Sequence, residues 1–141
     1  MTRQQYDTLA RLAVRHREEL NDEELVIDAL LGYSQKGSPS GKVDALVRRT
    51  AGAPVLALDV PSGLELESGR LHDPHIRAAA TLTLALPKEG LRSGHATEAV
   101  GDLYLADISV PPAVYGRLGL EYRSPFGRSP IVRIDAAALA G

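Results

Sequence analysis

The chain contains no Cys in its 141 residues. This absence excludes disulfides, thiolate catalysis and zinc or iron–sulfur sites built on Cys ligands. A protein without disulfides needs no oxidising compartment, and we expect this one in the cytoplasm. The first twenty residues carry many charges and no apolar stretch, so they do not resemble a secretory signal peptide.

Trp is also absent, and the aromatic residues are limited to five Tyr and one Phe. Few aromatics leave few platforms on which bases could stack. The formal net charge is only −2, so there is no broad basic field for nucleic acid or for an anionic membrane surface. No apolar run approaches the roughly 18 residues of a membrane-spanning helix. We therefore expect neither a nucleic-acid partner nor a membrane partner.

The remaining composition is typical of a globular domain. Apolar residues make up 44% of the chain and charged residues 24%, which are ordinary fractions. A chain of this length buries enough surface for one core. No repeat, low-complexity tract or long linker divides it, so we expect one domain over residues 1–141.

Apolar patterns predict strands that alternate with helices. Spacings of three and four residues predict amphipathic helices, and continuous apolar runs predict strands buried on both faces. The expected helical segments are 4–20, 42–50 with Ser40 as its N-cap, a short turn at 75–79, and 113–118; the expected strands are 25–31, 55–58, 81–86 and 102–108. This order predicts an α/β fold with a mainly parallel sheet.

Ionisable side chains stand at the carboxyl ends of three of these strands. Asp28 interrupts an apolar strand, Asp59 ends the next one, and Lys88 follows the third. Ligands of open parallel sheets bind at that edge. Pro61 and Gly63 turn the chain away after Asp59, and Ser62 adds a hydroxyl. Two carboxylates with a hydroxyl and nearby carbonyls form an oxygen-only environment that suits a hard cation.

A small, polar loop precedes the helix expected at 42–50. Because a helix N-terminus attracts anions, this loop is a candidate phosphate site, with positive charge from Lys36 and Lys88. It is not a Walker A loop, since Gly41-Lys42 is followed by Val43. The loop residues concerned are Gly32, Tyr33, Ser34, Gln35, Lys36, Gly37 and Ser38.

Simpler interpretations stand beside each of these. The two Asp residues are also compatible with helix caps or paired structural acids, and the loop with a flexible turn. The segment His72-Asp73-Pro74-His75 has metal-like spacing, but we favour a solvated loop there because Pro lies inside it and no partner cluster is evident. Only the coincidence of Asp28, Asp59 and Lys88 at one sheet edge favours a ligand site.

Four segments in order resemble the NAD(P)H-hydrate epimerase family, also called the YjeF N-terminal domain. They are Val26-Ile27-Asp28-Ala29-Leu30-Leu31-Gly32, Leu58-Asp59-Val60-Pro61-Ser62-Gly63-Leu64, Thr81-Leu82-Thr83 with Pro87-Lys88-Glu89-Gly90-Leu91, and Gly101-Asp102-Leu103-Tyr104 with Asp107-Ile108. The resemblance covers about residues 25–112, and the segment Asp59-Val60-Pro61-Ser62-Gly63 is its most specific part.

The resemblance implies a three-layer αβα Rossmann-like fold, often homodimeric. It implies an isomerase that interconverts the R and S epimers of hydrated NADH or NADPH, with an ADP- or ATP-dependent dehydratase as pathway partner. It implies a potassium ion held by Asp28 and Ser62, a loop over residues 32–38 that binds the ligand, and a substrate-contacting carboxylate at Asp59. Lys88 matches a family lysine to which we assign no separate role.

The family's N-terminal strands and its Gly-Asn-Asn-Gly-Gly-Asp loop have no counterpart in the sequence. We expect a fragment of a longer product, a domain completed by another chain, or a shortened relative without catalysis. Two functions follow from these alternatives: an epimerase with Asp59 as general acid/base, and a non-catalytic nucleotide-binding or scaffold module. An unpaired sheet edge would favour association, so we expect a homo-oligomer. A small kinase is disfavoured, because the chain has no phosphate-loop signature.

Overall fold

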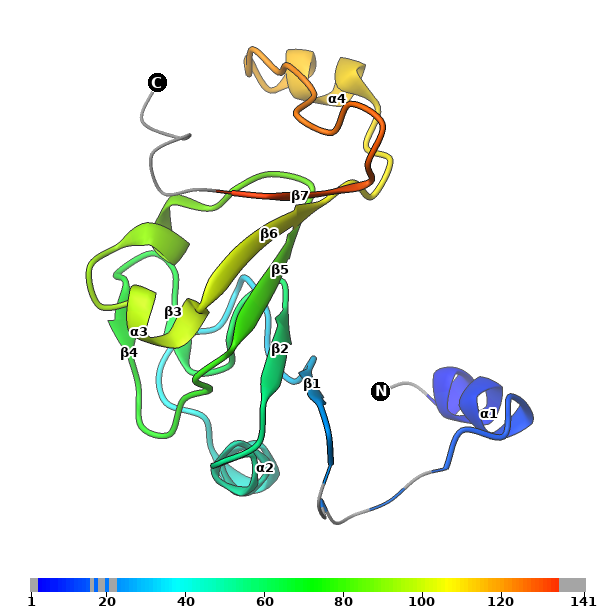
Figure 1. Ribbon diagram of the computed structural model, residues 1–141, viewed down its shortest axis with the longest axis vertical. Helices are drawn as coiled ribbons and strands as arrows, with labels where there is room; N and C mark the ends of the chain where they lie inside the picture. The colour runs from blue at the N-terminus through cyan, green and yellow to red at the C-terminus, as the bar shows by residue number, and fades with distance from the viewer. Residues whose placement is uncertain (1–2, 16, 18–19, 21–22, 135–141) are drawn as a thin grey trace.

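A computed structural model describes residues 3–15, 17, 20 and 23–134 (Figure 1). Its centre is a five-stranded sheet in the order β1-β2-β5-β6-β7. The first four strands are parallel, and β7 pairs antiparallel with β6. The strands are β1 (Val26–Asp28), β2 (Val55–Leu58), β5 (Ala80–Leu84), β6 (Asp102–Ala106) and β7 (Ile131–Arg133). The predicted α/β fold with a mainly parallel sheet is therefore confirmed.

The first strand is shorter than predicted. It ends at Asp28, whereas the apolar run continues to Leu31. The amide of Leu30 donates to Asp28 Oδ1, and the amide of Leu31 donates to Ser62 Oγ. Because side chains take up these amides, they are not available for a ladder with a neighbouring strand.

Helices flank the sheet. Helix α2 (Gly41–Arg49) and helix α4 (Pro112–Arg117) lie where they were predicted. Ser40 has the extended backbone of an N-cap, but its side chain makes no capping hydrogen bond. Helix α1 (Arg3–Arg11) ends well before residue 20, and Ala13 beyond it adopts a φ of +56°. Residues 16, 18 and 19 of that predicted helix lie outside the described residues. No helix among the described residues has the length and apolarity to cross a membrane.

Several elements were not predicted, and one prediction was wrong. The sequence did not indicate the hairpin of β3 (Leu64–Glu65) and β4 (Arg70–Leu71), the 3-10 helix η1 (Glu89–Arg92), helix α3 (Thr97–Val100) or strand β7. The turn predicted at 75–79 is absent, because the segment is drawn out along the chain that follows β2. There the amide of Ile76 donates to the carbonyl of Ser62 at 2.7 Å, and Ile76 is buried.

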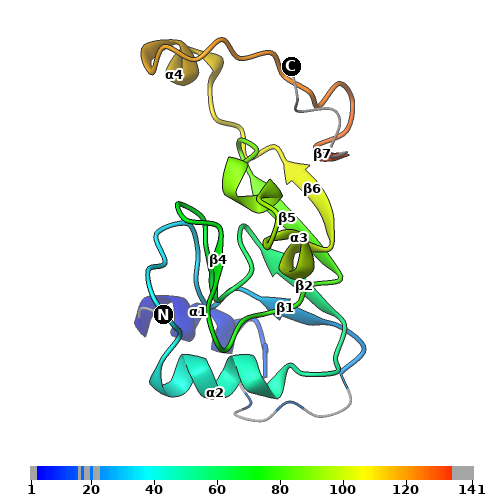
Figure 2. The ribbon, with the colours of Figure 1, turned by 90° about the vertical axis from the view of Figure 1, so that its left-hand side faces the viewer.

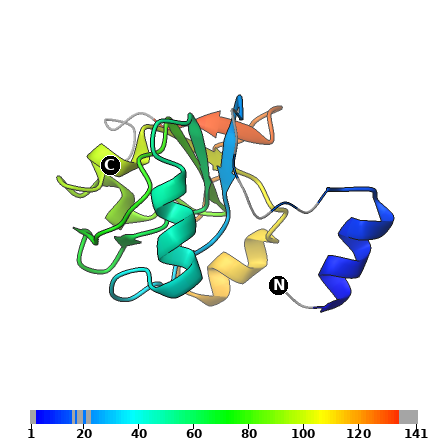
Figure 3. The same cartoon turned by 90° about the horizontal axis from the view of Figure 1, so that it is seen from below.

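One face of the sheet carries the core. Strand register places Val55, Ala57, Thr81 and Thr83 on the same face, where all four are buried. Helix α2, the β3–β4 hairpin, η1 and α3 lie against this side (Figures 2 and 3). One cluster contains Val47, Val55, Ala57, Ile76 and Ala78, and the second contains Val60, Leu64, Leu66, Leu91, Ala96 and Val100.

The opposite face is apolar and partly bare, and we call it the open face. Its central members, Leu56, Leu82 and Leu84, are only half-buried. Ile27 is 62% exposed and Ile131 is 46% exposed. Helix α1 lies beyond β1 on this side but contributes no buried side chain (Figure 3). The open face comprises Ile27, Leu56, Leu58, Leu82, Leu84, Tyr104 and Ile131.

Candidate active site

Asp59 lies at the carboxyl end of β2, as predicted, and its backbone is strained. Its φ of +71° is unusual for a residue other than Gly and costs roughly 1–3 kcal/mol. The Asp59 amide donates to the carbonyl of Leu82 at 2.9 Å, which fixes the turn against β5. Ala85, at the end of β5, also has a positive φ, of +65°. Two strained residues therefore stand at the same edge of the sheet.

Lys88 is the ion-pair partner of Asp59. Its Nζ donates to Asp59 Oδ1 at 2.5 Å and, at 2.9 Å each, to Thr83 Oγ1 and the carbonyl of Leu84. These three acceptors use all three ammonium protons. The Leu84 amide adds a longer contact of 3.3 Å to Asp59 Oδ1. Lys88 thus holds the carboxylate in a fixed orientation, a role that the sequence alone did not reveal.

The second oxygen of Asp59 faces the predicted ligand loop. A Cβ placed on Gly32 would lie 4.0 Å from Asp59 Oδ2, and the hydrogen bonds that the Asp59 carboxylate accepts from the described residues use Oδ1. A groove of about 670 Å³ lies beside this edge, lined by Tyr33 from the loop and by Lys88. A ligand in the groove would therefore lie beside Lys88, whose partner Asp59 directs Oδ2 toward the first residue of the loop, Gly32.

Asp28 and Ser62 meet directly, although they are 34 residues apart. Asp28 is 2% exposed and Ser62 is fully buried. Asp28 Oδ2 accepts from the Ser62 amide, and Asp28 Oδ1 accepts from Ser62 Oγ, both at 2.8 Å. The structure thus brings together the two residues that the resemblance assigns to a cation. Asp28 also has a structural role, because it accepts hydrogen bonds from the buried amide and hydroxyl of Ser62 in the turn after β2.

The loop 32–38 is only partly committed to internal contacts. Gln35 Oε1 accepts from the Gly63 amide at 2.9 Å, and Lys36 pairs with Glu67 at 3.3 Å on the surface. Tyr33 and Ser34 are exposed. The loop therefore presents polar groups beside Asp59 while remaining attached to the segment that follows it.

The segment 72–75 differs from its prediction as a solvated loop. His72 is only 8% exposed, and its Nε2 lies 2.9 Å from Glu65 Oε2. His72 is buried because the hairpin folds back: the His72 amide donates to the carbonyl of Gly63, while Asp73 remains exposed. Among the described residues, no three His, Asp or Glu side chains are grouped so that they could hold a metal ion.

Acid should weaken the fold through Glu65. The hydrogen bond from His72 lowers the pKa of Glu65 below its usual 4.5. A lowered folded-state pKa stabilises the fold above pH 4.5, and that contribution is lost as the pH falls through the folded-state value. We expect the unfolding free energy of Glu65→Gln to fall less steeply below pH 4.5 than that of the wild type. Chemical denaturation between pH 3 and 6 measures the unfolding free energy, and Glu121→Gln at an exposed position is the control. An equal change of unfolding free energy with pH for the wild type and Glu65→Gln would contradict this prediction.

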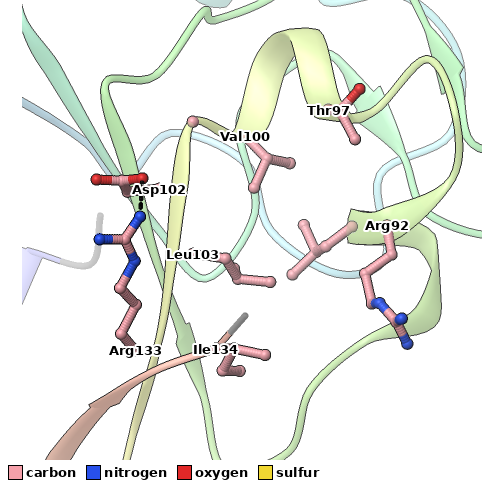
Figure 4. Close-up of a pocket in the computed structure, with 9 residues that line it drawn as sticks. Arg92, Thr97, Val100, Asp102, Leu103, Arg133 and Ile134 are labelled. Carbon is pink, nitrogen blue, oxygen red and sulfur yellow. Dashed lines mark hydrogen bonds and ion pairs between the residues drawn. The ribbon is translucent and has the colours of Figure 1, made fainter. Parts of the chain in front are cut away.

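A second cavity lies at the opposite edge of the sheet (Figure 4). It measures about 290 Å³ and is lined by Leu91, Val100, Leu103 and Ile134 among others. At its rim, Arg133 donates to Asp102 Oδ1 at 2.8 Å, and both side chains are more than half exposed. It is separate from Asp59, since it flanks the amino end of β6.

Comparison with known proteins shows the family of the chain. The model of the family "YjeF-related protein N-terminus" matches residues 2–90. The NAD(P)H-hydrate epimerase of Dehalogenimonas lykanthroporepellens is 42% identical over 122 residues, covering 84% of this chain and 48% of that protein. The bifunctional NAD(P)H-hydrate repair enzyme Nnr of Moorella thermoacetica is 40% identical over 90 residues, covering 62% of this chain and 17% of that protein. The chain thus spans about half the length of the curated epimerase it matches.

A solved structure gives the same fold. The crystal structure of yeast ynu0 (YNL200c) has a TM-score of 0.57 at 21% identity, covering 79% of this chain and 46% of that one. The fold and site define a Rossmann-like α/β protein with a carboxylate–lysine pair at the carboxyl edge of its sheet. The chain belongs to the YjeF-related protein N-terminus family.

Proposed function

We propose that this chain carries the acid/base site of an NAD(P)H-hydrate epimerase, acting on hydrated NADH and NADPH. The observation that carries the proposal is the Asp59–Lys88 pair, which leaves Asp59 Oδ2 directed toward the loop 32–38. Its relatives include proteins named NAD(P)H-hydrate epimerase at 42% and 44% identity.

The geometry suits proton transfer at one atom. Inverting the hydrated ring carbon requires a bond at that carbon to break and then to form again on the other face. In a ring-opening route, Asp59 Oδ2 would take the hydroxyl proton as the ring C–N bond breaks to leave an aldehyde, and would pass that proton to the ring nitrogen. Both transfers reverse when the nitrogen closes on the other face of the aldehyde carbon. Lys88 would keep Oδ1 occupied, so that one oxygen remains for the exchange. Residues 32–38 would hold the nucleotide portion of the substrate.

The proposal includes a potassium ion, for which Asp28 and Ser62 would supply part of the set of oxygen ligands. Asp28 is a buried carboxylate, and the ion pairs described for the structure do not include it. Its oxygens accept three hydrogen bonds, and Ser62 Oγ accepts one from Leu31, so each residue keeps an acceptor site. This chain would supply two adjacent oxygen ligands. When bound, the cation would supply positive charge at the carboxyl edge of the sheet.

Potassium should raise thermal stability if it binds there. At a free concentration tenfold above the dissociation constant, the gain is about 1.4 kcal/mol, or several degrees in Tm. We expect KCl to raise Tm above the value in choline chloride of equal ionic strength. Asp28→Asn should abolish that difference. Equal Tm values for the wild type in both salts, up to a few hundred millimolar, would argue against the site.

Self-association is the second structural proposal. The open face exposes apolar side chains from several strands, and β1 pairs only with β2 among the described residues. We expect light scattering to give a mass above 15.1 kDa, the mass of one chain. Ile27→Glu should return the mass to that of a monomer, whereas the matched Val114→Glu on α4 should not. A wild-type monomer at tens of micromolar would contradict this proposal.

Two further points follow from the epimerase proposal. Bifunctional repair enzymes among the relatives support a functional link to an NAD(P)HX dehydratase, which would consume the S epimer. We place the chain in the cytoplasm, in keeping with its lack of Cys. Cell fractionation tests the compartment.

A coupled assay separates the epimerase from a non-catalytic nucleotide-binding relative. Mixed NADHX epimers are incubated with an S-specific dehydratase and either this chain or a chimera in which it replaces the matched segment of the Dehalogenimonas epimerase. We expect the chimera to remove the R epimer well above the spontaneous rate. A folded chimera that binds nucleotide but leaves the R epimer at the spontaneous rate would favour the non-catalytic alternative.

A further inference from the structure

The loop 32–38 is attached at two points to the chain that follows β2. Near its middle, Gln35 Oε1 accepts from the Gly63 amide at 2.9 Å. At its end, Ser38 Oγ lies 3.5 Å from His72 Nδ1. The first contact is a short hydrogen bond. The second is at the upper limit of hydrogen-bond length, so it constrains the loop only if the His72 ring is itself fixed in place.

His72 is held firmly. Its amide donates to the carbonyl of Gly63 at 2.9 Å, and its own carbonyl lies 2.8 Å from His75 Nδ1. Its Nε2 lies 2.9 Å from Glu65 Oε2. An ionised carboxylate only accepts, so Nε2 carries the proton, and in the neutral ring Nδ1 is then an acceptor. That tautomer suits the hydroxyl of Ser38 as donor.

Both attachments converge on Gly63. The Gly63 amide donates to Gln35 Oε1, and the Gly63 carbonyl accepts from the His72 amide. Gly63 has a φ of +96°, and a Cβ there would lie 2.5 Å from His75 Cα, so only Gly fits this position. Gly63 follows Ser62 in the segment that begins at Asp59. The loop is thereby tied to the same segment as the carboxylate that it faces.

We propose that Gln35 and the His72–Glu65 pair are positioning residues that hold the loop 32–38 at a fixed distance from Asp59 and so set the affinity for the nucleotide. The proposal rests on the proposed function, because it takes this loop as the one that holds the ligand. Neither Gln35 nor His72 needs to touch the substrate; each acts through the backbone of Gly63 or through Ser38.

Amide hydrogen exchange of the free chain tests the attachment without any ligand. The variants are Gln35→Met and His72→Phe, which keep the size of the side chain but remove its hydrogen bonds. Exchange at the Gln35 amide, which donates to the carbonyl of Gly32, and at the Gly63 amide, which donates to Gln35 Oε1, should accelerate by up to about tenfold, since one hydrogen bond contributes about 0.5–1.5 kcal/mol. Glu65→Gln keeps an oxygen acceptor for Nε2–H and should therefore leave most of the protection in place. Gln4→Met and His95→Phe, the same changes at exposed positions, should leave exchange in the loop unchanged.

Two comparisons separate positioning from general destabilisation. Amides of β5 and β6 should keep their protection, and calorimetric titration with NADP+ should give a Kd up to about tenfold weaker in the two variants. Unchanged exchange in the loop, equal loosening of β5 and β6, or a looser loop with unchanged Kd would each overturn the proposal. If the wild type binds no NADP+, the ligand role of the loop is wrong, and the exchange data alone then decide whether the attachment exists.

Discussion

Replacing Asp59 with Asn should reduce epimerisation by about 10²–10⁴-fold while leaving the fold intact. Asn retains the volume of Asp and an oxygen for the hydrogen bonds from Lys88 and Leu84. Lys88 also keeps its contacts with Thr83 and the carbonyl of Leu84. What is lost is the basic oxygen that faces Gly32. The initial rate of R-epimer loss in the chimera measures the effect.

Asp102→Asn is the matched control for this substitution. Asp102 is exposed at the amino end of β6, where it pairs with Arg133, far from the groove beside Lys88. We expect its rate to equal that of the unaltered chimera. An Asp59→Asn chimera within threefold of the unaltered rate would exclude Asp59 as the acid/base group.

Replacing Asp28 with Ala should cause the largest loss of stability. The change removes the acceptor of the Ser62 amide and of Ser62 Oγ, in a site without access to solvent. Each buried donor left without a partner costs about 1–3 kcal/mol, so we expect a loss of about 2–6 kcal/mol. This is a large share of the 5–15 kcal/mol typical of a domain. Urea denaturation measures it.

An exposed counterpart provides the control. Asp107 Oδ1 accepts from the amide of Ser109 at 2.7 Å, much as Asp28 accepts from Leu30, but at the surface. Asp107→Ala should therefore cost no more than about 1 kcal/mol, because water can replace the lost acceptor. A loss of under 1 kcal/mol for Asp28→Ala would mean that the turn after β2 does not depend on this carboxylate.

Local signals made part of the site readable from sequence. Asp59 was placed correctly because an apolar strand, Pro61 and Gly63 together mark where a chain leaves a sheet. The sequence also placed Asp28, Ser62 and Lys88 at this edge, but it did not predict the Asp59–Lys88 and Asp28–Ser62 hydrogen bonds, which join residues 29 and 34 positions apart. Such pairs depend on strand register, here Leu58 opposite Leu82 and Asp28 opposite Ala57, and register is a property of the folded sheet.

The errors in the fold have similar causes. Helical spacing over residues 4–20 predicts which face a helix would bury, but α1 buries no side chain and ends at Arg11. The polarity of His72 led to the prediction of a solvated loop. The hairpin that encloses His72 was not predicted, because each of its strands is only two residues long and too short to show a sequence pattern. Strand β7 is a three-residue edge with no pattern of its own, and only its pairing with β6 defines it.

Loss of the R epimer of hydrated NADH, followed by NMR in the chimera, tests most directly whether the Asp59 site is catalytic. With this chain in place, the rate should lie within about tenfold of that of the Dehalogenimonas epimerase, and Asp59→Asn should bring it close to the spontaneous rate. A chimera that folds, binds NADP+ and still converts the R epimer only at the spontaneous rate would contradict the proposed function.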